Sequence, residues 1–234
     1  ARKSRGLGDV YKRQAVHVGS LLAVMIYFRQ EIGQMTVAWV TQGFSKQQST
    51  DSKLAWYVIV ATIPAVIIGF LMKGWIEDNA RTALVIAGTT IIFGLLLWYA
   101  DSTAKREQEL EGLTLKQAIY IGLAQVLALI PGTSRSGITM TAGLMLGLKR
   151  EACARFSFLL SIPVILGAGL LATLDLLKAN EAVDWYALLY GAAFSFVSAY
   201  LCIYLFLSWI SRIGMLPFVI YRLALGVILL WFVF

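Results

Sequence analysis

The sequence predicts an all-α, polytopic membrane protein with six transmembrane spans and one re-entrant helical hairpin. Of its 234 residues, 59% are hydrophobic and only 14% are charged, and the mean hydropathy is +0.75. A soluble domain of this size carries more charge on its surface. The apolar residues form long continuous runs rather than the period-two alternation of a transmembrane β-barrel, so the pattern disfavours a barrel.

Residues 1–14 are polar, basic and aperiodic, and they differ sharply from the apolar run that follows. Five basic residues and one acid give them a charge of +4 out of the formal +7 of the chain. Most other basic residues flank apolar runs, as membrane topology requires, so the net charge does not indicate a nucleic-acid partner. We interpret residues 1–14 as a non-native or artefactual tail, with a natural basic juxtamembrane arm as the alternative.

Six apolar runs are interpreted as transmembrane helices. The first, residues 15–28, has only 14 residues. This corresponds to about 21 Å of helix against a hydrocarbon core of about 30 Å, so we expect a span whose front end is missing. The other five runs are residues 54–72, 82–100, 152–176, 185–210 and 217–234.

Two shorter apolar segments in the middle of the chain predict a re-entrant hairpin over residues 115–148. Residues 115–130 and 138–148 are joined by the polar loop 131–137. The second segment corresponds to about 17 Å of helix, which is too short to cross a bilayer. Irregular backbone at membrane depth is tolerated only where it is buried in protein or lines a water-filled cavity.

The order of these elements predicts an inverted repeat of one hairpin and three spans. Residues 15–114 form three spans of a first copy without its hairpin, and residues 115–234 form the second copy. Basic residues in alternate connectors divide ten to three, which places the richer side in the cytoplasm. The hairpin enters and leaves on that side, so its tip is expected to point toward the outer face.

The loop 131–137 has the composition of an anion-binding site. Arg135 offers five N–H donors in a planar fork, and Ser134 and Ser136 add hydroxyl groups. This set suits the oxygens of a phosphate or diphosphate. Gly132 and Gly137 would let backbone amides approach such an anion closely.

Structural roles are the alternatives for the same residues. Arg135 can instead cap carbonyls or pair with an acid inside the bundle, although arginine at membrane depth is usually functional. Thr133 and the two serines can satisfy freed backbone groups at the tip. A hydroxyl nucleophile needs a base, and the sequence offers none nearby. Gln125 is expected to hydrogen-bond across helices, with support of the loop as its functional alternative.

Four further polar or reactive residues are not assigned to the anion-binding site. His17 is the only histidine, and we expect an interfacial rather than a catalytic role for it. Arg222 is expected to snorkel from the last span toward the cytoplasmic side. Cys153 and Cys202 lie in apolar runs without metal-site spacing and are interpreted as small core residues.

The segment 122–137, Gly-Leu-Ala-Gln-Val-Leu-Ala-Leu-Ile followed by Pro-Gly-Thr-Ser-Arg-Ser-Gly, resembles a signature of the bacterial undecaprenyl-diphosphate phosphatases. These enzymes are also called bacitracin-resistance proteins. Residues 18–24, 156–163 and 216–222 are similar to the same family, and the likeness covers about residues 15–234.

The resemblance implies an integral membrane hydrolase of the plasma membrane. It would remove the terminal phosphate of undecaprenyl diphosphate at the outer face, with a divalent cation such as Mg²⁺ or Ca²⁺, in the lipid-carrier cycle of peptidoglycan synthesis. Arg135 would grip the diphosphate, and Ser134 and Ser136 would ligate phosphate oxygens. The implied partners are the bilayer and a polyprenyl diphosphate lipid; a homodimer is left open. Gly132, Thr133, Gly137 and Gln125 would line or shape the substrate site.

The sequence departs from the family at its start. The family's first signature, a glutamate-rich helix running into a Ser-Ser-Gly-His loop, is absent, and the metal ligands are expected in that segment. We therefore expect this chain by itself to have little or no activity. A transporter or flippase of an anionic lipid or small anion is the alternative function, because inverted repeats with broken helices are typical of secondary transporters.

Overall fold

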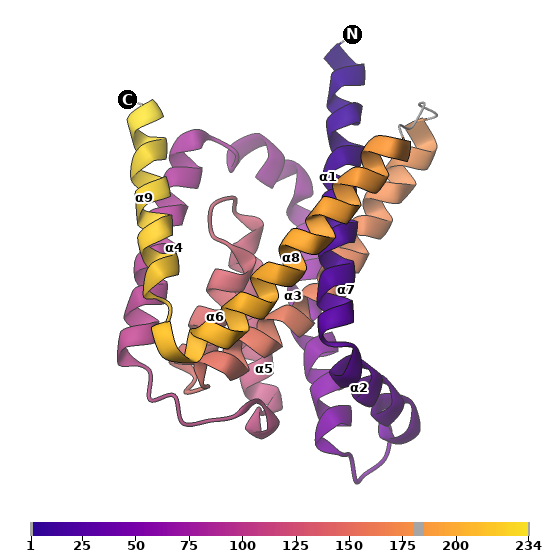
Figure 1. The fold of residues 1–234 in the computed structure, drawn as a ribbon, viewed down its shortest axis with the longest axis vertical. Coiled ribbons are helices and arrows are strands. Elements are labelled where there is room, and N and C mark those ends of the chain that lie inside the picture. The colour runs from indigo at the N-terminus through magenta and orange to yellow at the C-terminus, as the bar shows by residue number, and fades with distance from the viewer. Residues whose placement is uncertain (1, 180–184, 234) are drawn as a thin grey trace. The chain divides into compact units, whose positions relative to one another are not determined.

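A computed structural model describes residues 2–179 and 185–233, which form helices and connecting loops (Figure 1). Within these ranges no β-strand forms. Two short 3₁₀ helices, η1 (Leu110–Gly112) and η2 (Leu127–Leu129), accompany the α-helices. The α-helices are α1 (Arg2–Tyr27), α2 (Arg29–Gln42), α3 (Thr50–Asn79), α4 (Ala83–Thr103), α5 (Leu115–Val126), α6 (Arg135–Met145), α7 (Arg150–Ala179), α8 (Trp185–Ile213) and α9 (Leu216–Val233).

Five of these helices contain segments that are long and apolar enough to cross a membrane, which confirms the all-α, multi-pass class. The segments are Thr50–Met72, Ala83–Thr103, Arg150–Leu170, Tyr186–Ile213 and Leu216–Val233. The sixth predicted span corresponds to the shorter apolar stretch Ala15–Tyr27 at the end of α1. That helix begins at Arg2, so the backbone of residues 2–14 is helical as well.

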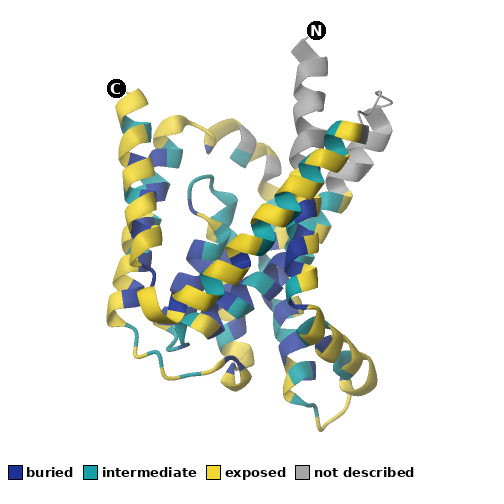
Figure 2. Ribbon diagram, viewed as in Figure 1, coloured by how far each residue is buried: buried dark blue, intermediate teal, exposed yellow. Residues whose placement is uncertain are grey.

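Many residues along the long helices are exposed (Figure 2), and large apolar residues are among them. Phe70 of α3, Trp98 of α4 and Trp231 of α9 are 74%, 51% and 82% exposed. Contiguous apolar surface of this kind is unfavourable in water and is suited to lipid contact. Of the two cysteines, Cys153 is buried as expected, whereas Cys202 is exposed, so its assignment to the core is wrong.

The chain divides into two compact units. One combines residues 1–34 with 161–206, and the other combines residues 35–160 with 207–234. In the first unit Ser195 of α8 donates a hydrogen bond from Oγ to the Val16 carbonyl of α1 over 2.7 Å. Each unit takes segments from both halves of the chain, so this division does not test the predicted sequence repeats. All the residues predicted for the anion site belong to the second unit.

In the second unit α5 and α6 form a helical hairpin whose open ends meet. Gln117 in the first turn of α5 donates a hydrogen bond from Nε2 to the Leu146 carbonyl, directly after α6, over 3.2 Å. Thr114 and Gln117 form a capping box that starts α5. The hairpin packs against α3 and α4, and α4 runs beside α9 (Figure 1).

The hairpin differs from the prediction at its tip. The helix α6 begins at Arg135 rather than at residue 138, because Ser134 caps it: the Ser134 hydroxyl accepts a hydrogen bond from the Gly137 amide over 3.2 Å. On the other arm the last turn tightens into η2. Residues 130–134 are therefore the only irregular backbone between η2 and α6. We call these residues, together with Arg135 at the start of α6, the tip loop.

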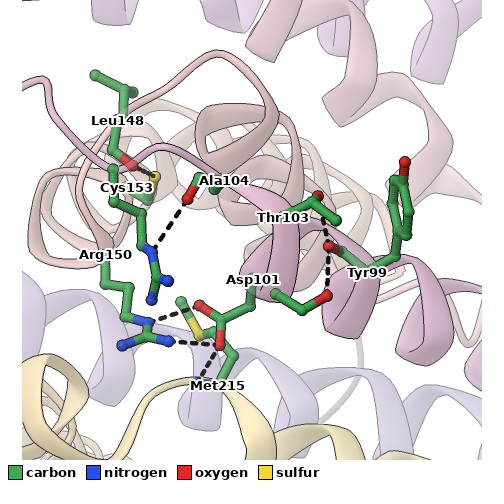
Figure 3. A network of polar contacts seen from close by, with 10 residues as sticks. Tyr99, Asp101, Thr103, Ala104, Leu148, Arg150, Cys153 and Met215 are labelled. Carbon is green, nitrogen blue, oxygen red and sulfur yellow. Dashed lines mark hydrogen bonds and ion pairs between the residues drawn. The ribbon is translucent and has the colours of Figure 1, made fainter.

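A second polar network joins three helices at the far end of α4 (Figure 3). Arg150 of α7 donates from Nε to Oδ1 of Asp101 over 2.6 Å and from Nη2 to Oδ2 over 2.9 Å. The same Oδ2 accepts a hydrogen bond from the Met215 amide at the start of α9 over 3.2 Å. We call these three residues the Asp101 network, and it ties α4, α7 and α9 together through one carboxylate.

Candidate active site

Two threonines of α4 hold the tip loop by its carbonyls. Thr89 donates a hydrogen bond from Oγ1 to the Pro131 carbonyl over 2.6 Å. The Thr90 hydroxyl lies 3.2 Å from the Gly132 carbonyl and 2.6 Å from the Ile86 carbonyl of its own helix, so the two carbonyls share its one proton. Gly132 has φ +91°, and a Cβ atom there would lie 2.2 Å from Oγ1 of Thr89. Only glycine fits both the backbone conformation and the contact.

Ser134 is exposed and adopts a left-handed backbone conformation, with φ +68° and ψ 114°. A non-glycine residue in this region costs about 1–3 kcal/mol, and such residues occur preferentially at functional sites. Because Ser134 caps α6, it lies where a helix presents unpaired N–H groups and the positive end of its dipole. The tip loop thus presents a hydroxyl and a helix N-terminus at one place.

Arg135 is held in place by one of its N–H groups. It is partly buried, and Nη1 donates to the Ser157 carbonyl of α7 over 2.8 Å. This hydrogen bond corresponds to the alternative role considered for Arg135, in which it caps a backbone carbonyl inside the bundle. None of the described carboxylates forms an ion pair with Arg135, so its charge is not neutralised and its other donors are available to a ligand.

Ser157 also orients the first turns of α6. Thr139 donates from Oγ1 to Oγ of Ser157 over 2.9 Å, and its hydroxyl also lies 3.0 Å from the Arg135 carbonyl. Ser157 and Thr139 are both buried. Sequence reasoning did not single out either residue, although Ser157 lies in the stretch 156–163 that resembles the phosphatase family.

The remaining predicted site residues occupy different environments. Ser136 is partly exposed in the first turn of α6, beside Arg135. Thr133 is fully buried, and its Oγ1 has no hydrogen-bond partner. Gln125 is buried at the contact with α3, where Nε2 lies 3.5 Å from the Ala61 carbonyl. This bond confirms the expected interaction across helices, and it places Gln125 in the α3–α5 contact rather than in the tip loop.

Arg222 is the residue whose placement was predicted wrongly. It is only 8% exposed, and it points into the protein instead of snorkelling to the membrane surface. Its Nη2 donates to the carbonyls of Thr133 and Gly132 over 2.8 and 2.9 Å, and it lies 3.4 Å from the Thr90 carbonyl. The sequence feature that could have indicated a role for Arg222 is its position at the end of the stretch 216–222, which resembles the phosphatase family.

The described residues do not make a metal centre. Within the part of the chain that the structure describes, no group of three or more His, Cys, Asp or Glu residues is placed to hold a metal ion. His17 is exposed on α1, in the other compact unit. The divalent cation stays a prediction, and the chemistry derived below uses no metal.

Comparison with known proteins identifies the family of this chain. The family model described as bacitracin resistance protein BacA matches residues 6–228. A protein named undecaprenyl-diphosphatase, from Alteromonas mediterranea, is 97% identical over 220 residues, which are 94% of this chain and 83% of that relative. The matched region includes the hairpin, the tip loop and Arg222. The chain belongs to the BacA family of bacitracin resistance proteins.

Proposed function

We propose that this protein hydrolyses undecaprenyl diphosphate to undecaprenyl phosphate and inorganic phosphate. One structural observation supports the proposal independently of the name of the similar protein. The tip loop presents a guanidinium that is held by a single N–H, beside a strained serine and a helix N-terminus. Each of these groups favours bound phosphate oxygens, and together they form a site for a dianionic or trianionic headgroup.

The proposed role of Arg135 follows from the chemistry of phosphoryl transfer. A water oxygen forms a bond to the terminal phosphorus while the bond from that phosphorus to the bridging oxygen breaks. The bridging oxygen leaves with undecaprenyl phosphate, and the protons of the water pass to the released inorganic phosphate and the leaving phosphate. Negative charge spreads over the equatorial oxygens in the transition state, and a preorganised guanidinium stabilises it there. Ser134 and Ser136 can donate to the same oxygens. No described histidine or carboxylate hydrogen-bonds to either serine, so neither is proposed as the nucleophile.

We also propose that the α5–α6 hairpin is re-entrant and that its tip opens to the outer side of the bacterial plasma membrane. Its open ends lie beside the connector that carries Lys105 and Arg106, because Gln108 of that connector hydrogen-bonds to Gln117 and to the backbone of Gly147. This connector is on the side predicted to face the cytoplasm. The tip loop contacts Thr89, which lies six residues, roughly 9 Å, after the N-terminal end of α4. That end of α4 is the one away from the connector with Lys105 and Arg106. This depth suits a lipid headgroup that enters from the outer face.

The proposed cellular role is recycling of the lipid carrier for peptidoglycan synthesis. Bacitracin resistance fits this role, and it is the property in the name of the matching family. Expression of the protein in a bacitracin-sensitive bacterium should raise the inhibitory concentration of bacitracin, and an Arg135→Ala variant present in the same amount should not.

Two measurements on the purified protein in detergent test the proposal. Calorimetry should show binding of inorganic diphosphate, and undecaprenyl diphosphate should give one phosphate for each undecaprenyl phosphate formed. Binding of diphosphate without phosphate release would contradict hydrolysis by this chain and leave the diphosphate site alone supported. Absence of both would reject the phosphatase. Addition of EDTA, followed by Mg²⁺ or Ca²⁺, tests the expected divalent cation.

The alternative transporter makes a different prediction. Proteoliposomes loaded with an unlabelled anionic lipid or phosphate should then show counterflow of a labelled copy without hydrolysis. Phosphate release in detergent, where no membrane separates two compartments, favours the enzyme.

A further inference from the structure

We propose that Arg222 is a positioning residue of the diphosphate site: it holds the tip loop in the conformation that aims Ser134 and Arg135 at the ligand, and its unneutralised charge favours an anion there. This inference rests on the proposed function, because it concerns the same site. Arg222 comes from α9, 87 positions after Arg135 in the chain, and it reaches the tip loop through buried hydrogen bonds.

The first step concerns the backbone of the tip loop. The carbonyl of Thr133 belongs to the peptide plane that precedes Ser134, so its direction is coupled to the φ angle of Ser134. Arg222 Nη2 donates to this carbonyl over 2.8 Å and to the preceding carbonyl of Gly132 over 2.9 Å. Two consecutive carbonyls held by one nitrogen atom restrict the peptide planes that lead into Ser134, whose φ is +68°. The strained conformation of Ser134 therefore depends on a contact from another helix.

The second step concerns the first turn of α6. A Cβ atom added to Gly137 would lie 2.6 Å from Nη1 of Arg222 and 3.2 Å from Oγ of Ser134. The guanidinium therefore packs against the turn that carries Arg135 and Ser136, in space that a side chain at residue 137 would fill. Gly137 was predicted to admit a ligand, and in the structure the space beside it is taken by Arg222.

The third step concerns charge. Nε and Nη1 of Arg222 are buried and have no hydrogen-bond partner. None of the described carboxylates pairs with Arg222 or with Arg135. Carbonyl acceptors do not neutralise a cation, and a buried unpaired charge is unfavourable. A diphosphate bound at the tip loop supplies the missing negative charge, so these two arginines favour the anion-bound state.

Arg222→Lys tests the inference because it keeps the charge and loses the planar fork. We expect hydrogen exchange over residues 131–139 to become faster and the dissociation constant for inorganic diphosphate to rise about tenfold. In preparations with measurable turnover, kcat should fall on the order of 100-fold, because small misplacements of a catalytic group have effects of this size. The melting temperature should change by only a few degrees.

Arg150→Lys is the matched control, since Arg150 also donates to two acceptors but lies in the Asp101 network. It should lower the melting temperature and speed exchange near residues 99–106, with unchanged exchange over 131–139 and unchanged diphosphate affinity. If Arg222→Lys fails to fold, Gly137→Ala decides, because the added methyl group displaces Nη1 while alanine favours a helix. It should give the same faster exchange and weaker diphosphate binding.

The inference is overturned if Arg222→Lys, or Gly137→Ala in its place, shows the exchange of the unmodified protein over residues 131–139 and the same diphosphate affinity. A purely structural role is the result if Arg222→Lys behaves like Arg150→Lys, with a lower melting temperature alone. Failure of the proposed function is a separate outcome. In that case the unmodified protein neither binds diphosphate nor releases phosphate, whereas the exchange comparison still reports whether Arg222 holds the tip loop.

Discussion

Arg150 and Arg222 belong to the same compact unit, and each donates from its guanidinium to two or more acceptors on other helices. Their acceptors differ. Arg150 meets the carboxylate of Asp101, so the pair is neutral, whereas every acceptor of Arg222 among the described residues is a carbonyl group, so no described carboxylate neutralises its charge. The contacts of the two networks with α4, at Asp101 and at Thr90, are 11 residues apart, roughly 17 Å along the helix. One helix thus supports a neutral network at one end and a cationic network nearer the other.

The backbone conformation around Arg150 is regular, whereas the backbone that Arg222 contacts is strained. Asp101 and Arg150 lie in regular helix, and their contact stabilises the packing of α4 and α7. The tip loop has two residues with positive φ, Gly132 and Ser134, separated by Thr133. Unneutralised charge and strained backbone both destabilise a protein without ligand, and both are expected where a ligand binds. Charge and backbone conformation therefore distinguish the Asp101 network, which stabilises the packing of helices, from the contacts of Arg222 with the tip loop, where a ligand is expected.

The largest effect is expected for Arg135→Lys, which removes the fork from the tip loop but keeps the charge. Phosphate release from undecaprenyl diphosphate should fall on the order of 100- to 1000-fold, the size of effect found when one preorganised donor is lost. The melting temperature should stay close to that of the unmodified protein, because the Arg135 side chain has one described hydrogen bond, to the Ser157 carbonyl, which lysine can also make. Release and diphosphate binding near the unmodified values would reject the role of Arg135.

Asp101→Asn should have the next largest effect, and on stability rather than on binding. It leaves the charge of Arg150 without its partner, and breaking a buried pair typically costs 3–5 kcal/mol. Asp101 and Arg150 have side chains that are 11% and 21% exposed, so we expect a smaller loss, about 2 kcal/mol. Thermal unfolding in detergent measures it. The double variant Asp101→Asn/Arg150→Met should recover part of the lost stability. A changed diphosphate affinity in Asp101→Asn would contradict the assignment of the Asp101 network to stability alone.

Thr90→Val should have the smallest effect, because the Thr90 hydroxyl lies closer to the Ile86 carbonyl within α4, over 2.6 Å, than to the tip loop, and valine keeps the shape of the side chain. The bond from Thr90 to the Gly132 carbonyl is 3.2 Å long, and that carbonyl keeps its bond from Arg222. We expect a loss of about 1 kcal/mol in stability and a severalfold weaker diphosphate affinity, measured by thermal unfolding and calorimetry. An effect on affinity as large as that of Arg222→Lys would show that α4, and not α9, positions the tip loop.

Much of the hairpin could be predicted from the sequence. Two apolar segments too short to span, joined by a polar loop, predicted a pair of helices that enters and leaves on one side, and the bond from Gln117 to Leu146 confirms that the open ends meet. The start of α6 was placed three residues too late, because Ser134 acts as an N-cap from a left-handed conformation that composition does not reveal. Arg222 was misplaced because a single arginine in an apolar run is consistent both with snorkelling and with burial against a distant loop.

The sequence by itself determined the membrane class, the hairpin and the group of arginine, serines and glycines at its tip, because segment length and local composition carry that information. Tertiary structure decided which charges are neutralised. Arg150 meets Asp101 across 49 positions of sequence, and Arg222 meets the carbonyl of Thr133 across 89. Contacts of such separation depend on how helices pack, and only packing shows that one arginine stabilises the bundle while the other holds the tip loop with its charge unneutralised.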